Sequence, residues 1–112
     1  MNKVYTIEDA INVVKDHDTI LMGGFLLCGY PYYLVEQLNK TTATNLTVVS
    51  SDTGTSDCPT YELMKSGRVK KVVASYIGAN SETGRLYMTK EAEVELVPQG
   101  TFAERIRAAG AG

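Results

Sequence analysis

Four short β-rich runs separated by helical patterns are the feature that most constrains the fold of this 112-residue chain. The runs are residues 19–22, 46–50, 69–76 and 93–97. Apolar residues recur at helical spacing between them, in residues 31–38, 59–65 and 80–88. Strands that alternate with helices through short connections form a parallel sheet, because each helix returns the chain to the same edge. We therefore predict an α/β fold, an open and mostly parallel sheet flanked by helices.

A further helix is predicted at each end of this pattern. Thr6 is a favourable N-cap for a helix that continues to near Lys15, with acidic residues in its first turn. Near the other end, Thr101 and Glu104 have the spacing of a capping box. The apolar residues of this second helix are spaced to face one core, and they are Phe102, Ile106 and Ala109.

Charge and composition exclude several classes of protein. Eleven Lys and Arg against thirteen Asp and Glu leave a net charge of −2, which removes the usual electrostatic basis for binding nucleic acid or an anionic membrane. No apolar run approaches the roughly 20 residues of a membrane span, and Glu8 and Asp9 interrupt any secretory signal. Cys28 and Cys58 form no C-x-x-C pair, and His17 is the single histidine, so we expect no metal. A soluble, cytoplasmic protein is predicted.

The glycine-rich stretch 23–31 joins the first strand to the following helix. Such a turn can direct bare backbone N–H groups at an anion or at a developing oxyanion. A Walker loop would need Lys and then Ser or Thr after Gly29, where Tyr30 and Pro31 stand. The spacing also differs from the G-x-G-x-x-G fingerprint of dinucleotide sites. On the residues alone, a tight turn that only needs small residues is an equally good interpretation.

The same stretch carries a longer signature. Residues 16–31 read Asp-His-Asp-Thr-Ile-Leu-Met-Gly-Gly-Phe-Leu-Leu-Cys-Gly-Tyr-Pro. This segment closely resembles the signature of family I CoA-transferase α subunits, and only His17 departs from the preferred Gly or Asn. The likeness extends to residues 45–47, 72–78, 93–96 and 98–108. It implies that residues 1–112 are the N-terminal part of a single α-subunit domain, with a sheet that is incomplete at the C-terminus.

The resemblance also implies a reaction. Family members move coenzyme A from an acyl-CoA to a free carboxylate, here a short-chain acid such as acetate, butyrate or acetoacetate. A glutamate of the β subunit attacks the thioester, forms an acyl-glutamyl anhydride and then holds CoA as a glutamyl thioester. No Glu-Asn-Gly motif occurs in this chain, and Glu82 is its nearest imitation. The nucleophile is therefore expected on a β subunit of a hetero-oligomer, with CoA as a substrate and no cofactor.

Five residues match positions of the family's site. Gly23, Gly24 and Phe25 match the loop that approaches the substrate, which offers backbone N–H groups and one aromatic wall. Gln99 matches a glutamine whose side-chain amide donates to the thioester oxygen, a catalytic role. Ser51 stands where many members carry Asn, and its shorter hydroxyl donates only one hydrogen bond.

Two other functions stay open at this point. The same fold can serve a non-catalytic module that only binds a partner or ligand, because fold does not dictate function. An acyl-CoA hydrolase would use a similar ligand but would release free acid without an acceptor carboxylate. An assay with and without the acceptor acid separates the last two reactions.

Overall fold

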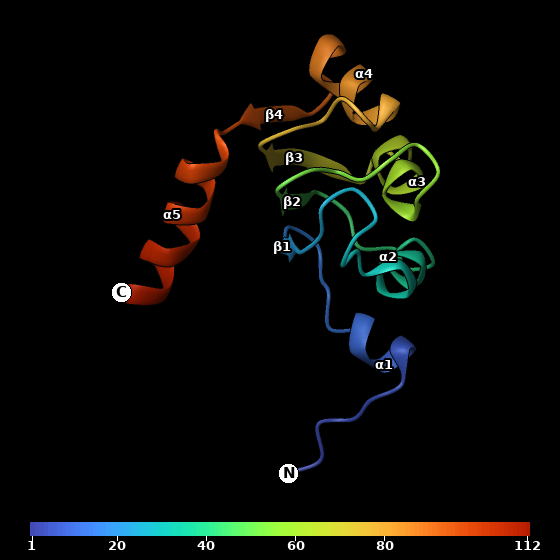
Figure 1. Cartoon of the computed structure of the whole chain (residues 1–112). Coiled ribbons are helices and arrows are strands. Elements are labelled where there is room, and N and C mark those ends of the chain that lie inside the picture. The colour runs from blue at the N-terminus through green and yellow to red at the C-terminus, as the bar shows by residue number, and fades with distance from the viewer.

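A four-stranded parallel sheet with helices packed on one face forms the body of the molecule in the computed structural model, which describes residues 1–112 (Figure 1). The elements in chain order are α1 (Ile7–Ile11), β1 (Thr19–Met22), α2 (Tyr32–Leu38), β2 (Leu46–Ser50), α3 (Pro59–Lys65), β3 (Val69–Ala74), α4 (Ser81–Thr89), β4 (Glu93–Leu96) and α5 (Gln99–Ala111). The spatial order of the strands is their order in the chain. The predicted open parallel sheet is confirmed.

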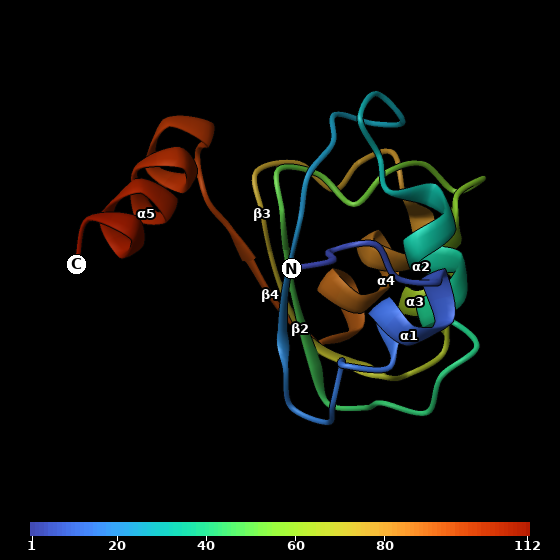
Figure 2. The ribbon, with the colours of Figure 1, turned by 90° about the horizontal axis from the view of Figure 1, so that it is seen from below.

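The two faces of the sheet differ in how they are covered. Because successive side chains of a strand point to opposite faces, in-register residues form rows across the sheet. The row Ile20, Val48, Val72 and Val94 lies under α1 to α4, where Val48 and Val72 are fully buried. Figure 2 shows these four helices on one side of the sheet. The core of the protein therefore lies between this face and α1 to α4.

The helix α5 does not pack as predicted. Among its residues only Phe102 is buried, whereas Ile106 is 41% exposed and Ala109 is also exposed. Figures 1 and 2 show α5 on the opposite side of the sheet from the other helices and standing apart from it. Outside its first turn it is tied to the sheet by an ion pair from Arg105 to Glu95 of β4, 2.8 Å long. The prediction that three α5 residues face one core is wrong beyond Phe102.

The predicted capping box at Thr101 is also wrong. The helix α5 begins two residues earlier, at Gln99, with Pro98 at the N-cap and no side-chain capping bond. The carbonyl of Pro98 accepts the N–H of Phe102 at 2.8 Å, which starts the helical ladder before Thr101 is reached. Gln99 therefore lies in the first turn of a helix.

Two other predicted elements end early. The helix α1 begins after Thr6, whose hydroxyl caps Asp9 N–H as predicted, but it stops at Ile11. The strand β3 ends at Ala74, because the N–H groups of the next two residues, Ser75 and Tyr76, both donate to the carbonyl of Ser51. Two donors on one carbonyl interrupt the regular ladder.

No helix of the chain combines the length and the apolar character that crossing a membrane requires.

Candidate functional site

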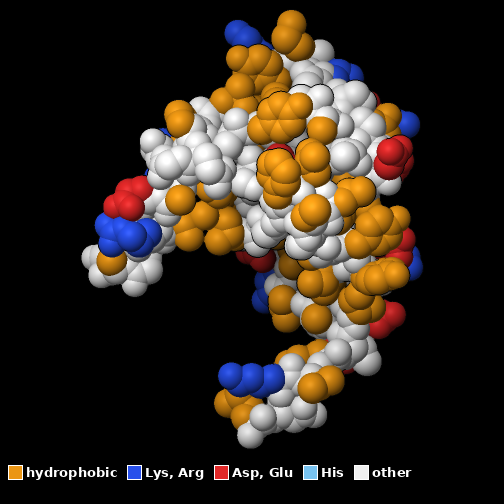
Figure 3. Space-filling view, in the orientation of Figure 1, with side chains coloured by type: hydrophobic (Ala, Val, Ile, Leu, Met, Phe, Trp, Pro, Cys, Tyr) orange, Lys and Arg blue, Asp and Glu red, His pale blue; other side chains and the backbone are white.

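The candidate site lies at the edge where the strands end. The carboxyl ends of parallel strands meet at one edge, and ligands of open α/β sheets bind there. The segments that follow β1, β2 and β4 contain all five predicted site residues. Figure 3 shows apolar side chains gathered over the middle of the molecule. Of the exposed large apolar residues, Phe25 and Leu27 follow β1 and Tyr76 follows β3.

The loop after β1 is a small, strained hairpin. Phe25 and Cys28 exchange two backbone hydrogen bonds of 2.9 and 2.8 Å, so two residues form its tip. One of them, Leu26, has a φ of +53°, which is unfavourable for a branched side chain. Phe25 is 69% exposed, although an aromatic residue of this size is normally largely buried. The hairpin therefore holds an aromatic side chain out at the edge of the sheet.

The two glycines that precede the hairpin have different constraints. Gly24 has a φ of +123°, and a Cβ built on it would lie 3.2 Å from the backbone Cα of Tyr30. A side chain is therefore excluded at Gly24 by both conformation and space. Gly23 has no such φ, and a Cβ there would meet nothing within 4 Å. Of these two glycines, only Gly24 needs to be glycine for the loop to fold.

Two side chains from the end of β2 hold this loop. Asp52 is only 6% exposed, and its two carboxylate oxygens accept the backbone N–H groups of Leu26 and Gly54, each at 2.8 Å. The hydroxyl of Ser51 donates to the carbonyl of Gly24 at 2.8 Å. Ser51 thus lies beside the glycine loop, as its predicted place in the site requires, and its hydroxyl proton is engaged by the loop.

Gln99 lies at the same edge with its amide in a defined orientation. The hydroxyl of Ser75 donates to Oε1 of Gln99 at 2.8 Å, and Nε2 of Gln99 donates to no group of the chain. The residue is exposed at the start of α5. Its two N–H donors are therefore available to a ligand oxygen.

A line of hydrogen bonds connects three of the predicted residues. The hydroxyl of Ser51 donates to the carbonyl of Gly24, and the N–H of Ser75 donates to the carbonyl of Ser51 at 2.9 Å. The hydroxyl of Ser75 in turn donates to Oε1 of Gln99. These residues follow β1, β2, β3 and β4 in turn. Sequence reasoning missed Asp52, which lies in the loop after the predicted strand 46–50, and Ser75, which was expected inside the strand 69–76 but follows its observed end at Ala74. The structure thus brings Gly24, Ser51 and Gln99 into one connected edge.

No carboxylate described so far is free to act as a nucleophile. Both oxygens of Asp52 accept backbone N–H groups. The side chain of Glu82 is 15% exposed and is bound by Arg85 at 2.8 Å, in the first turn of α4. Hydrogen bonds from Arg85 to Glu91 and Glu82 raise the pKa of that guanidinium further above its usual range. What this edge offers is donors and an aromatic surface.

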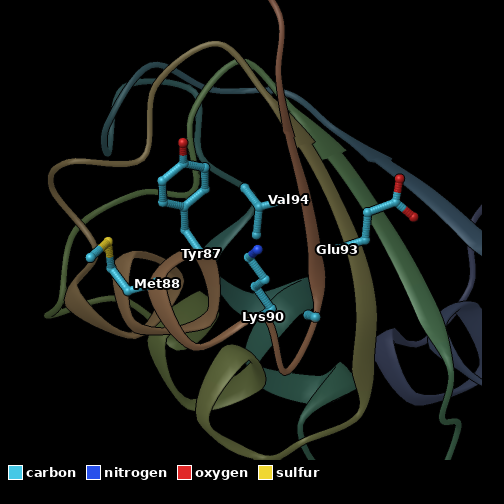
Figure 4. A pocket seen from close by; sticks show the side chains of 6 residues that line it. Tyr87, Met88, Lys90, Glu93 and Val94 are labelled. Carbon is cyan, nitrogen blue, oxygen red and sulfur yellow. The ribbon is translucent and has the colours of Figure 1, made fainter.

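Most surface pockets lie away from the five predicted site residues. The largest, of about 650 Å³, is an open cleft between the end of α4 and the start of β4, and none of the five predicted site residues lines it. Figure 4 shows Tyr87 and Val94 on one side of β4, with the Glu93 carboxylate turned to the other side. An apolar groove of about 220 Å³ between α1, α2 and β1 does include Gly23. The predicted residues thus form an edge with one groove beside it.

The comparisons with known proteins agree on one family. The family model described as coenzyme A transferase matches residues 4–112. The acetoacetyl-CoA:acetate/butyrate CoA transferase alpha subunit of Clostridium acetobutylicum is 44% identical over 111 residues, 99% of this chain and 51% of that protein. The acetate CoA-transferase subunit alpha of Escherichia coli is 46% identical over 110 residues, 98% of this chain and 50% of that protein.

Solved structures show the same fold. An acyl-CoA transferase of Escherichia coli O157:H7, in its thioester complex with CoA, superposes with a TM-score of 0.82 at 23% identity, over 96% of this chain and 22% of that one. The chain spans about half the length of these two curated relatives. With the glycine-loop signature, the matching family model and the fold all in agreement, this chain belongs to the coenzyme A transferase family.

Proposed function

We propose that this chain acts as the α subunit of a CoA-transferase and supplies the acyl side of its active site. The partner is a β subunit that carries the nucleophilic glutamate, and residues 1–112 form the N-terminal part of one α-subunit domain. The substrates are a short-chain acyl-CoA and a free acid such as acetate, butyrate or acetoacetate. The names of the relatives, alpha subunits of acetate, butyrate and acetoacetyl-CoA transferases, support this choice.

The observation that carries the proposal is the amide of Gln99. Its oxygen is held by Ser75, its Nε2 is free, and it lies at the strand edge with the Gly24 loop. A donor fixed before the substrate arrives stabilises an oxyanion without reorganising during the reaction. An exposed Phe25 on the same edge offers an apolar wall for a short acyl chain.

The chemistry assigns a defined task to these groups. The partner's glutamate oxygen bonds to the thioester carbon, the carbonyl oxygen becomes an oxyanion, and CoA thiolate leaves when the tetrahedral intermediate collapses to an anhydride. The thiolate then attacks the glutamyl carbonyl and releases the first acid. Gln99 donates to the oxyanion while it exists, and backbone groups of the Gly24–Phe25 loop line the space that the acyl group occupies. CoA is a substrate throughout, and the scheme needs no cofactor or metal.

Substitution of Gln99 in the assembled enzyme tests the proposal. Gln99→Glu preserves size and the acceptor for Ser75 but removes the donor, so kcat should fall about 10²- to 10³-fold, the usual cost of one oxyanion donor. Gln37→Ala, on the half-buried surface of α2, is the matched control and should leave kcat unchanged.

The acceptor acid decides between transfer and the alternatives. A transferase forms the new acyl-CoA only when the acceptor carboxylate is present. Release of free CoA and acid without acceptor would identify a hydrolase instead. A loss of less than tenfold on Gln99→Glu would show that the amide does not contact the oxyanion.

A further inference from the structure

The hydroxyl of Ser75 is a candidate for a role of its own. It is half-buried, directly after β3, and it donates to Oε1 of Gln99 at 2.8 Å. We propose that Ser75 is a positioning residue, which holds the oxygen end of the Gln99 amide at the strand edge and so leaves Nε2 to face the substrate. This inference rests on the proposed function, in which Gln99 donates to the thioester oxyanion.

The need for such a residue follows from the shape of an amide. The oxygen and nitrogen ends of Gln99 are nearly equal in size, so a half-turn about the last side-chain bond exchanges a donor for an acceptor. An acceptor facing an oxyanion repels it. The Ser75 hydroxyl is able to donate to Oε1 or to accept from Nε2, and in this structure it donates to Oε1, which leaves both N–H groups of Nε2 for the oxyanion. An oxyanion repels Oε1 and attracts Nε2, so the substrate favours the same orientation of the amide. Gln99 is exposed, and the hydrogen bond from Ser75 is the contact that holds its amide in place.

Ser75 is itself held by the backbone of the sheet. Its N–H donates to the carbonyl of Ser51 at 2.9 Å, and the hydroxyl of Ser51 donates to the carbonyl of Gly24 at 2.8 Å. The Ser75 hydroxyl that holds the Gln99 amide is therefore connected, through Ser51, to the backbone of the Gly24 loop. A serine anchored in this way fixes the place of the Gln99 amide at this edge.

A double-mutant cycle in the assembled enzyme tests the assignment. Ser75→Ala should lower kcat about tenfold, since one rotamer-rich side chain is no longer held, while KM for the acyl-CoA changes less than about twofold. Ser75→Thr keeps the hydroxyl and should restore kcat to within about threefold. With Gln99→Ala already present, adding Ser75→Ala should cost nothing further, because the two residues act as one unit.

Two further variants distinguish the loss of this hydrogen bond from a general loss of folding. Ser66→Ala removes a serine hydroxyl before the opposite end of β3, where it bonds the carbonyl of Leu63, and kcat should stay unchanged. Ser75→Cys keeps the size of the side chain with only a weak donor, so kcat should fall as for Ser75→Ala. The midpoint of thermal unfolding is measured for every variant, and Ser75→Cys decides the test if Ser75→Ala does not fold.

The outcomes separate this inference from the function on which it rests. If Gln99→Ala is strongly impaired while Ser75→Ala and Ser75→Cys stay within twofold of the unmodified enzyme, the positioning role is wrong and the proposed function stands. A double variant in which the two losses multiply would place the effect of Ser75 elsewhere and overturn the assignment. An enzyme without transfer activity, or one indifferent to Gln99→Ala, overturns both.

Discussion

Replacing Gly24 with alanine tests whether backbone strain shapes the glycine loop. At its φ of +123° an L-residue is strained, which costs about 1–3 kcal/mol. The new Cβ would also lie 3.2 Å from Tyr30 Cα and 3.4 Å from Tyr30 N, atoms of the backbone that cannot rotate away. Forcing such a contact costs about 1–3 kcal/mol more. Together, Gly24→Ala should lower the free energy of unfolding by roughly 2–6 kcal/mol.

The neighbouring glycine provides the control. Gly23→Ala makes the same chemical change, but its Cβ meets nothing within 4 Å and its φ is not in the left-handed range. It should leave the free energy of unfolding unchanged or raise it by up to about 1 kcal/mol, because alanine reduces the entropy of the unfolded chain. Of these two neighbouring substitutions, only Gly24→Ala is expected to destabilise the protein.

Urea unfolding followed by far-UV circular dichroism measures the difference. Equal slopes for both variants allow the shift in midpoint to be converted to free energy. The melting temperature of Gly24→Ala should fall by roughly 8–24 °C for a domain of this size, and that of Gly23→Ala should not fall. A difference of less than about 1 kcal/mol between the two variants would refute the reasoning, since it would mean that the loop relaxes freely around the new methyl group.

Two further predictions concern buried polar groups behind the loop. Asp52→Asn should lower the free energy of unfolding by about 1–3 kcal/mol, because the new N–H₂ cannot accept one of the two backbone N–H groups that Asp52 binds. The exposed Asp57→Asn is its control in urea unfolding, and equal effects would contradict the prediction. Burial raises the pKa of Tyr30, whose hydroxyl bonds Thr60. Its contribution to stability is therefore full below the unfolded pKa near 10 and is lost as pH rises above it. The urea midpoint should fall more steeply from pH 9 to pH 11 than in Tyr30→Phe, and identical slopes would exclude this role for the hydroxyl.

Local sequence patterns predicted the order of all nine elements correctly. The bounds of β1, β2 and α3 are those expected, because each is an apolar run with clear breaks at both sides. Asn80 caps α4 as one of the two expected caps, through bonds to the N–H groups of Glu82 and Thr83. These features depend on residues within a few positions of one another, so a single sequence contains what is needed to predict them.

Predictions that depended on distant partners were less successful. The apolar spacing in α5 indicated a core-facing helix, but spacing cannot show whether a surface lies opposite it, and Ile106 has none in this chain. The end of β3 was placed too late, because its last two expected residues share one acceptor, Ser51, more than twenty positions earlier. A capping pattern at Thr101 was overridden by Pro98, whose carbonyl starts α5 first.

The difference between what the sequence determines and what the tertiary structure decides is clearest in the candidate site. By itself the sequence determined the family, through the glycine signature, and the set of loops at the strand ends, since parallel strands must end at one edge. Only the tertiary structure decided that Asp52 holds Leu26, that Gly24 and not Gly23 must be glycine, and that Ser75 contacts Gln99. Those residues are paired by hydrogen bonds across 26 and 24 positions of sequence. Such pairs form because the sheet brings their strands together, and no local pattern records which side chains then meet.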